Sequence, residues 1–221
     1  MSEDNKARIR RRASKGYRRR QLIEATITCI AKKGLNDTTL SDVATLAGLS
    51  QGLINLHFET KDNLLRETLL YIQDEYECAW REALEKSVNE PAQRLAALIR
   101  ADYLPHIMSR DKMAVWFGFW GEVKARPTYQ KICREKMEER TALLVSLIED
   151  LIVKGEYENM EAKGIADTLT ALADGLWLNV LIGTQKNRTD AEQVMLNYIG
   201  QLFVRHRAAF SIKKRGAEAP L

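Results

Sequence analysis

Apolar residues recur at helical intervals along almost the whole chain. Between residues 17 and 34 they predict one helix, and Gly34 ends it as a C-cap. The next segment, TTLSDVATLAG, starts with Thr39 and has Asp42 three residues later, which is the spacing of a capping box. Its apolar positions follow i, i+3, i+4 and i+7, so they form one face of a second helix that Gly48 closes.

The stretch LSQGLINLHFETKDNLL holds two further helix starts. Ser50 is expected to cap a short segment over residues 51–58, and Thr60 a long helix over about 61–86. The short segment has too few residues for a stable isolated helix, so it must be held by its neighbours. Ile54 and Phe58 lie four residues apart and share one face, which predicts that they pack on the preceding helices.

Longer helical patterns fill the remainder of the chain. They cover about 91–108, 111–125, 127–154, 161–183 and 189–210, the last with Thr189 and Glu192 as a second capping box. Only four prolines occur, and alternating runs rich in Val, Ile and Thr are nearly absent. We therefore predict an all-α fold of about nine helices. Its expected parts are a disordered basic arm (1–16), a three-helix domain (17–62), a larger helical domain (63–210) and a disordered tail (211–221).

The tight AGLS turn between the second and third helices predicts a helix-turn-helix, whose third helix can enter a major groove. Gln51 and Asn55 carry amides that can read adenine. Gly52 lets the helix N-terminus approach a duplex closely, because it has no side chain. Leu53 and Leu56 could rest on thymine methyl groups, and the alternative is that either leucine is buried against the larger domain.

Charge is distributed unevenly along the chain. Residues 1–20 hold nine Lys or Arg against two acids and carry +7, whereas the net charge of +4 leaves −3 for the rest. Such an arm suggests an anionic partner, with nucleic acid as the first candidate and a membrane surface as the second. Alone, it would more often be a solvated tail. Beside a helix-turn-helix, it supplies salt-dependent attraction to phosphates, and its arginines can enter a minor groove.

The sequence gives little support for a membrane protein, a secreted protein or an enzyme. No apolar run reaches the roughly 18 residues of a membrane span, and no hydrophobic region follows the basic N-terminus, so we expect neither a membrane partner nor a secretion signal. Three widely separated cysteines fit reduced thiols in the cytoplasm. The histidines form no metal motif, and cationic neighbours could lower the pKa of Cys133, but local spacing places no base beside it. We expect no enzyme, metal or cofactor.

The region from Thr39 through SDVATLAGLSQG to HFETKDNLL resembles the DNA-binding domain of the TetR family of transcriptional regulators, over about residues 17–65. The resemblance implies phosphate contacts from His57 and Lys61, whose alternatives are a packed or capping histidine and a solvated surface charge. Asn55 stands where many members have Tyr, which implies a different base or backbone contact. The DNA-binding residues expected on all these grounds are Arg18, Thr39, Ser50, Gln51, Gly52, Leu53, Asn55, Leu56, His57 and Lys61.

Aromatic residues gather in the C-terminal half. In MAVWFGFWGEV they recur at helical spacing, a stripe that is more often core than binding site. The segments KMAVWFGFWGEVKARPTYQKICREKMEER and LADGLWLNVLIG resemble the BetI-type regulators, whose named member responds to choline. The resemblance implies a quaternary-amine effector held over tryptophan faces, with Glu122 or Asp174 as counter-charge. The expected effector-binding residues are Tyr103, Trp116, Phe117, Trp120, Asp174 and Trp177.

The last two helices have apolar faces that suit a four-helix dimer interface. A twofold dimer would place two recognition helices on successive major grooves, about 34 Å apart, and would read a pseudo-palindrome. The expected function is therefore that of a cytoplasmic homodimeric regulator. By family default it is a repressor that a small-molecule effector releases from double-stranded DNA. The alternative is a basic nucleic-acid or membrane interaction protein without sequence specificity.

Overall fold

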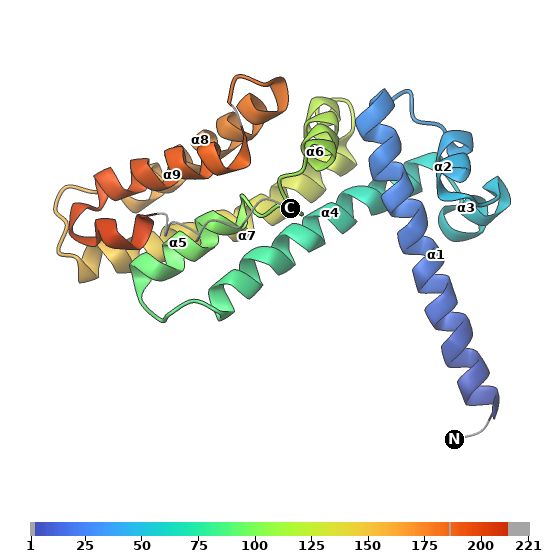
Figure 1. The fold of residues 1–221 in the computed structure, drawn as a ribbon, viewed down its shortest axis with the longest axis horizontal. Coiled ribbons are helices and arrows are strands. Elements are labelled where there is room, and N and C mark those ends of the chain that lie inside the picture. Colours follow the sequence, from blue (N-terminus) through green and yellow to red (C-terminus); the bar gives the residue numbers. More distant parts are fainter. Residues whose placement is uncertain (1–2, 186, 212–221) are drawn as a thin grey trace, which may run out of the picture. The chain divides into compact units, whose positions relative to one another are not determined.

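A computed structural model describes residues 3–185 and 187–211, and over these ranges the chain is helical without strands (Figure 1). This confirms the predicted all-α class. The elements are α1 (Glu3–Lys33), α2 (Leu40–Ala47), α3 (Gln51–Phe58), α4 (Lys61–Glu85), α5 (Pro91–Ala101), α6 (Arg110–Glu122), α7 (Pro127–Lys154), α8 (Ala162–Ile182), α9 (Arg188–Leu202) and the 3₁₀-helix η1 (Val204–Phe210).

The chain divides into two compact units. The head unit contains the chain up to Asp74 together with Arg110–Ile132, and the body unit contains Glu75–Ser109 and the chain from Cys133. The head therefore holds more than the three-helix domain expected at 17–62, because α6 packs against α1. Gly118 lies at this contact, where an added Cβ would be 3.8 Å from Leu35.

Helix α1 begins at Glu3, so the prediction of a disordered arm over residues 1–16 is wrong from Glu3 onward. Lys, Arg and Ala dominate the added turns and are good helix formers, and extending an existing helix needs no new nucleus. Residues 1–2 lie outside the described part, as does the predicted tail from 212 onward. Among the α1 side chains whose burial is described, from Lys15 onward, Leu22 is the first that is fully buried.

Local capping follows the sequence closely in the head. Thr39 and Asp42 form the predicted capping box of α2, and Gly48 ends that helix in the left-handed conformation at φ 63°. Thr60 Oγ1 accepts the backbone N–H of Asn63 at 3.1 Å, as expected of the α4 cap. Ser50 occupies the N-cap position of α3 but makes no side-chain capping hydrogen bond.

Two helices of the body end or begin elsewhere than expected. Helix α5 stops at Ala101 instead of about 108. Pro105 explains this, because it cannot donate to the carbonyl of Ala101 and disfavours helical backbone in the residue before it. Helix α9 begins at Arg188, where Asn187 accepts the backbone N–H of Asp190 at 3.0 Å; this replaces the cap expected at Thr189.

Helices α8 and α9 pack against each other and leave an apolar face exposed. Leu178 and Ile182 of α8 are 42% and 61% exposed, and Val194 of α9 is 42% exposed. Among the described helices, α8 alone has the length and composition of a membrane span, which the sequence analysis did not expect, yet only 22% of its most apolar window is buried. The exposed apolar side of α8 is therefore a candidate interface with another surface.

Candidate nucleic-acid interface and buried polar cluster

The short helix α3 is anchored on one side and open on the other. Ile54 and Phe58 are almost completely buried, at 1% and 3% exposure, which confirms the predicted packing face. Gln51 and Asn55 are exposed, and Leu56 is 74% exposed, so Leu56 is not buried against the larger domain. The helix thus exposes two amides and one leucine to solvent, while the buried Ile54 and Phe58 fix its position.

Gly52 lies in the first turn of this exposed face. An added Cβ would meet only Ser50 Oγ, at 3.9 Å, which is an ordinary contact. Its φ does not lie in the left-handed region either. Neither packing nor backbone conformation within the chain therefore requires glycine here, which is consistent with a close approach from outside. Leu53, the other leucine of α3, is half-buried.

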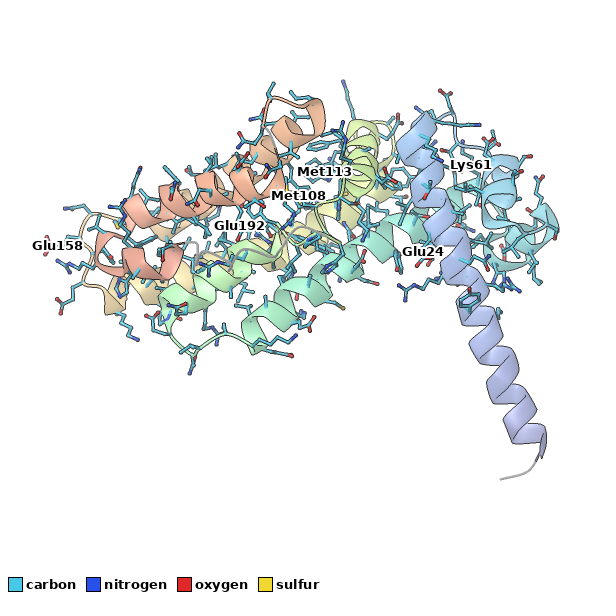
Figure 2. All side chains as sticks on the ribbon, viewed as in Figure 1. Glu24, Lys61, Met108, Met113, Glu158 and Glu192 are labelled. Carbon is cyan, nitrogen blue, oxygen red and sulfur yellow. The ribbon has the colours of Figure 1, made fainter. Side chains whose placement is uncertain are left out.

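The flanks of α3 carry the other predicted contacts. Thr39, the N-cap of α2, is exposed. Lys61, labelled in Figure 2, donates from Nζ to the backbone carbonyl of Asn36 at 2.8 Å. An ammonium has three donors, so Lys61 keeps donors for another acceptor. Arg18 Nη1 donates to Gln21 Oε1 at 2.8 Å, and Gln21 in turn reaches the end of α2.

His57 lies in the last turn of α3 and is half-buried. Burial lowers its pKa, and the nearby charges of Lys15 and Arg19 lower it further. Its Nδ1 is buried without a hydrogen-bond partner among the described residues. A neutral imidazole can still donate one N–H from its other nitrogen. Arg19 also lies 5.3 Å from the ring centre of Phe58, so cationic side chains surround this end of α3.

The body unit contains a polar cluster that the local sequence patterns do not indicate. Arg140 Nη2 of α7 donates to Asp102 Oδ2 at 2.6 Å, and the hydroxyl of Tyr76 on α4 donates to Asp102 Oδ1 at 2.6 Å. Asp102 and Arg140 are buried, at 1% and 8% exposure. Burial opposes the charge on Arg140, but Asp102 outweighs it, and the pKa of Arg140 is raised. In the sequence, Arg140 is one charge among many in α7.

Unpaired donors surround this ion pair. Arg140 Nε, the Tyr103 hydroxyl and Trp177 Nε1 are buried and have no hydrogen-bond partner among the described residues. The ring of Trp177 meets Tyr76 edge-on, with centres 6.3 Å apart. Such donors are costly to leave unsatisfied, so they mark a place where an acceptor would be favourable.

Asp174 of α8 adds a second carboxylate to the same region. Burial raises its pKa to about 6, Arg140 counteracts this in part, and Asp102 adds to it. With a pKa of about 6, Asp174 is mostly ionised at neutral pH. Asp174 therefore adds a carboxylate near the ring of Tyr76 and one helical turn from Trp177, an arrangement that favours a cation.

The predicted effector residues fall into two groups. Tyr103, Asp174 and Trp177 all belong to the body cluster. Trp116, Phe117 and Trp120 lie on α6 in the head, where Trp120 contacts the other two rings at centre distances of 6.1 and 5.2 Å.

The structure does not favour Glu122 as a counter-charge for an effector or Cys133 as a reactive thiol. Glu122, one proposed counter-charge, accepts a hydrogen bond from Asn36 Nδ2 at 2.8 Å within the head. Cys133 is buried, which raises its pKa to about 11, so this thiol is not activated by its cationic neighbours, in agreement with the expectation of an inert thiol.

Comparisons with known proteins agree with this architecture. A family model described as bacterial regulatory proteins of the tetR family matches residues 22–68, and one described as the C-terminal part of BetI-type transcriptional repressors matches residues 91–204. The HTH-type transcriptional regulator BetI of Yersinia pestis (strain Pestoides F) is 30% identical over 186 residues, covering 83% of this chain and 91% of the relative. BetI of Burkholderia mallei (strain NCTC 10229) is also 30% identical over 186 residues, covering 84% and 93%.

Solved structures with the same fold include a transcriptional regulator from Pseudomonas aeruginosa PAO1, with a TM-score of 0.74, 26% identity and coverage of 89% of this chain and 95% of that one. A regulator from Saccharomonospora viridis, solved in complex with choline, also has a TM-score of 0.74, with 24% identity and coverage of 82% and 94%. At that identity the likeness extends to the fold alone.

Proposed function

The chain belongs to the TetR family of transcriptional regulators and has a C-terminal half of BetI type, and on this premise we propose that it is a repressor that binds a pseudo-palindromic operator as a homodimer and leaves it when a small effector binds. The open face of α3 carries the proposal. Gln51, Asn55 and Leu56 are exposed on a helix that Ile54 and Phe58 anchor. Amides, which can pair with adenine, and apolar side chains, which can contact the thymine methyl, are among the groups that distinguish base pairs in a major groove.

The dimer is proposed to form through α8 and α9. Leu178, Ile182 and Val194 leave an exposed apolar face on two packed helices. Two such helix pairs can bury each other in a four-helix arrangement. A twofold dimer then repeats the recognition helix, so that each copy reads one half of a palindrome. The expected location is the cytoplasm, where genomic DNA is accessible to a bacterial regulator.

The effector is proposed to be choline or another quaternary amine that binds at the body cluster. The carboxylate of Asp174 and the faces of Trp177 and Tyr76 suit a cation. The unpaired donors of Tyr103, Trp177 and Arg140 suit a hydroxyl or other acceptor on the same molecule. Choline combines these two features, and it is the molecule bound in the Saccharomonospora viridis regulator.

Helix α4 offers a route from effector to DNA. Tyr76 of the cluster and Lys61 beside the recognition helix belong to this one continuous helix, which contributes residues to both units. A ligand that moves or rotates α4 at Tyr76 would therefore also act at its first turn. Coupling of this kind typically amounts to about 1–3 kcal/mol, and it must be reciprocal, so operator DNA should weaken effector binding equally.

The test is selection of duplexes from a random library by the purified full-length protein, followed by sequencing. Enrichment of a pseudo-palindrome would support a dimeric, sequence-reading regulator. The enriched duplex is then titrated with the protein in the presence of choline and of a quaternary amine without a hydroxyl. Binding that fades with salt and shows no enriched sequence would refute operator reading and favour the nonspecific basic protein. Enrichment without release by either amine would refute only the effector.

A further inference from the structure

Polar contacts join the first turn of α4 to the corner between α6 and α7, within the head unit. Lys61 Nζ donates to the backbone carbonyl of Asn36, in the turn between α1 and α2, at 2.8 Å. The side-chain amide of Asn36 donates in turn to Oε1 of Glu122, the last residue of α6, at 2.8 Å. Through this turn, Lys61 is therefore attached to α6.

Two ion pairs lead back from Glu122 to α4. Arg126 Nε lies 3.8 Å from Glu122 Oε2, and Arg126 Nη1 donates to Asp62 Oδ1 at 2.9 Å. Asp62 follows Lys61 in the chain, so these contacts close into a ring. We call its members the polar ring: Asn36, Lys61, Asp62, Glu122 and Arg126. All of them belong to the head unit.

The polar ring holds a lysine where the helix itself does not favour one. Lys61 is the first residue of α4, and a positive charge there opposes the helix dipole. Ion pairs as exposed as those of the ring add little to stability. Helix α6 also packs against α1, where Gly118 lies near Leu35 and Ile30, so the head has apolar support besides the ring. The ring is therefore free to serve a role other than stability.

A lysine whose position is already restricted binds a phosphate with a smaller loss of entropy than a free one. The lysine side chain is long and flexible, and ordering it costs free energy whenever it binds. With one donor on the carbonyl of Asn36, the ammonium of Lys61 keeps two donors for another acceptor. Lys61 also follows Phe58, the last residue of α3, by only three residues. The restricted ammonium is therefore close in the chain to the helix that is proposed to enter the groove.

We propose that Glu122 is a positioning residue for DNA binding, which acts through Asn36 to hold the ammonium of Lys61 ready for a phosphate. This rests on the proposed function, because it requires the head to bind duplex DNA with Lys61 on a phosphate. The carboxylate of Glu122 would itself repel phosphates, so any gain in affinity that it provides must come through the lysine. The contact raises affinity and leaves the choice of sequence to α3.

The experiment uses a charge-matched pair of variants of the full chain. Glu122→Gln keeps a side-chain oxygen that can accept the hydrogen bond from Asn36, whereas Glu122→Ala removes it. Both variants lose the same negative charge, so a difference between them reports the hydrogen bond and not the charge. Each change is made in the wild-type chain and in Lys61→Ala, and affinity for the selected operator is measured by titration at one salt concentration. Circular dichroism and thermal unfolding check that all variants retain the fold.

Glu122→Ala is expected to bind the operator about threefold to tenfold more weakly than Glu122→Gln, because ordering one lysine side chain costs up to roughly tenfold in affinity. In the Lys61→Ala background the two changes should bind alike, since the lysine that they position is absent. Equal affinities of the two variants in the wild-type background would overturn the proposal. A difference that persists without Lys61 would also overturn it, because Glu122 would then act on another part of the head.

Operator reading and the positioning role fail separately. If the selection returns no shared sequence, the proposed operator reading has failed, and the same variants are titrated with arbitrary duplexes. A difference between the Glu122 variants that depends on Lys61 would still support the positioning role there, because phosphate binding needs no particular sequence, and the absence of that difference would overturn it. If an operator is found but Lys61→Ala binds it as tightly as wild type, operator reading stands and the positioning role is wrong.

Discussion

Replacing Asp174 by asparagine should stabilise the protein at neutral pH while abolishing its response to a cationic effector. Burial raises the pKa of Asp174 to about 6, against an ordinary value of 3.8. Because the folded pKa lies above the unfolded one, the folded state holds this proton more tightly. The associated stability is complete below pH 4 and is lost as the pH rises through 6.

The magnitude follows from the pKa difference. A pKa of about 6 instead of 3.8 corresponds to at most about 3 kcal/mol at neutral pH. Asp174 is partly exposed, so solvent screening reduces this to about 1–2 kcal/mol. The asparagine side chain of the variant has no ionised form and avoids the cost, whereas at pH 4 the wild-type side chain is itself largely neutral. For a chain of this length the gain corresponds to roughly 2–8 °C in Tm.

The assay is unfolding followed by circular dichroism at pH 4.5 and pH 7.5, for wild type, Asp174→Asn and Asp167→Asn. Asp167 lies on the same helix but is exposed and pairs with Lys163, so its variant should change stability by less than about 0.5 kcal/mol at either pH. Choline binding by calorimetry should be lost only in Asp174→Asn. A stability gap for Asp174→Asn that is absent or independent of pH would refute the argument that burial of this carboxylate destabilises the ionised form.

Three further changes test the other parts of the molecule. Lys61→Ala should weaken binding to all duplexes and lower the slope of log affinity against log salt by about one. Gln51→Ala should instead shift the preference among operators by about 1–3 kcal/mol. Equal losses of affinity on every sequence after the Gln51 change would count against base reading. Ile182→Glu should convert the proposed dimer to a monomer in sedimentation, whereas Val153→Glu, at a site 78% exposed on α7, should not; an unchanged sedimentation of both variants would exclude the α8 face. Asp102→Ala leaves a buried arginine unpaired and should lower the free energy of unfolding, measured in urea, by about 3–5 kcal/mol. A loss below about 1 kcal/mol would contradict the burial of the Asp102–Arg140 ion pair.

Sequence alone determined the features that depend on neighbouring residues. The capping box of Thr39, the left-handed Gly48 and the cap at Thr60 are set by contacts within four residues, so their spacing could be interpreted directly. The anchored face of α3 also followed from helical periodicity, whereas the sequence left open whether Leu56 is exposed or buried against the larger domain. Boundaries were less secure where two signals compete, as at Asn187, which caps α9 in place of Thr189.

Only the tertiary structure decided which distant residues meet. Asp102 and Arg140 are 38 positions apart, and nothing in either local pattern indicates that packing buries both and forces them to pair. For the same reason the aromatic residues of α6 could not be separated from Trp177, although α6 packs with the head and Trp177 lies in the body. Helical periodicity identifies the apolar side of a helix but not its partner, because any apolar face gains similarly from being buried against another.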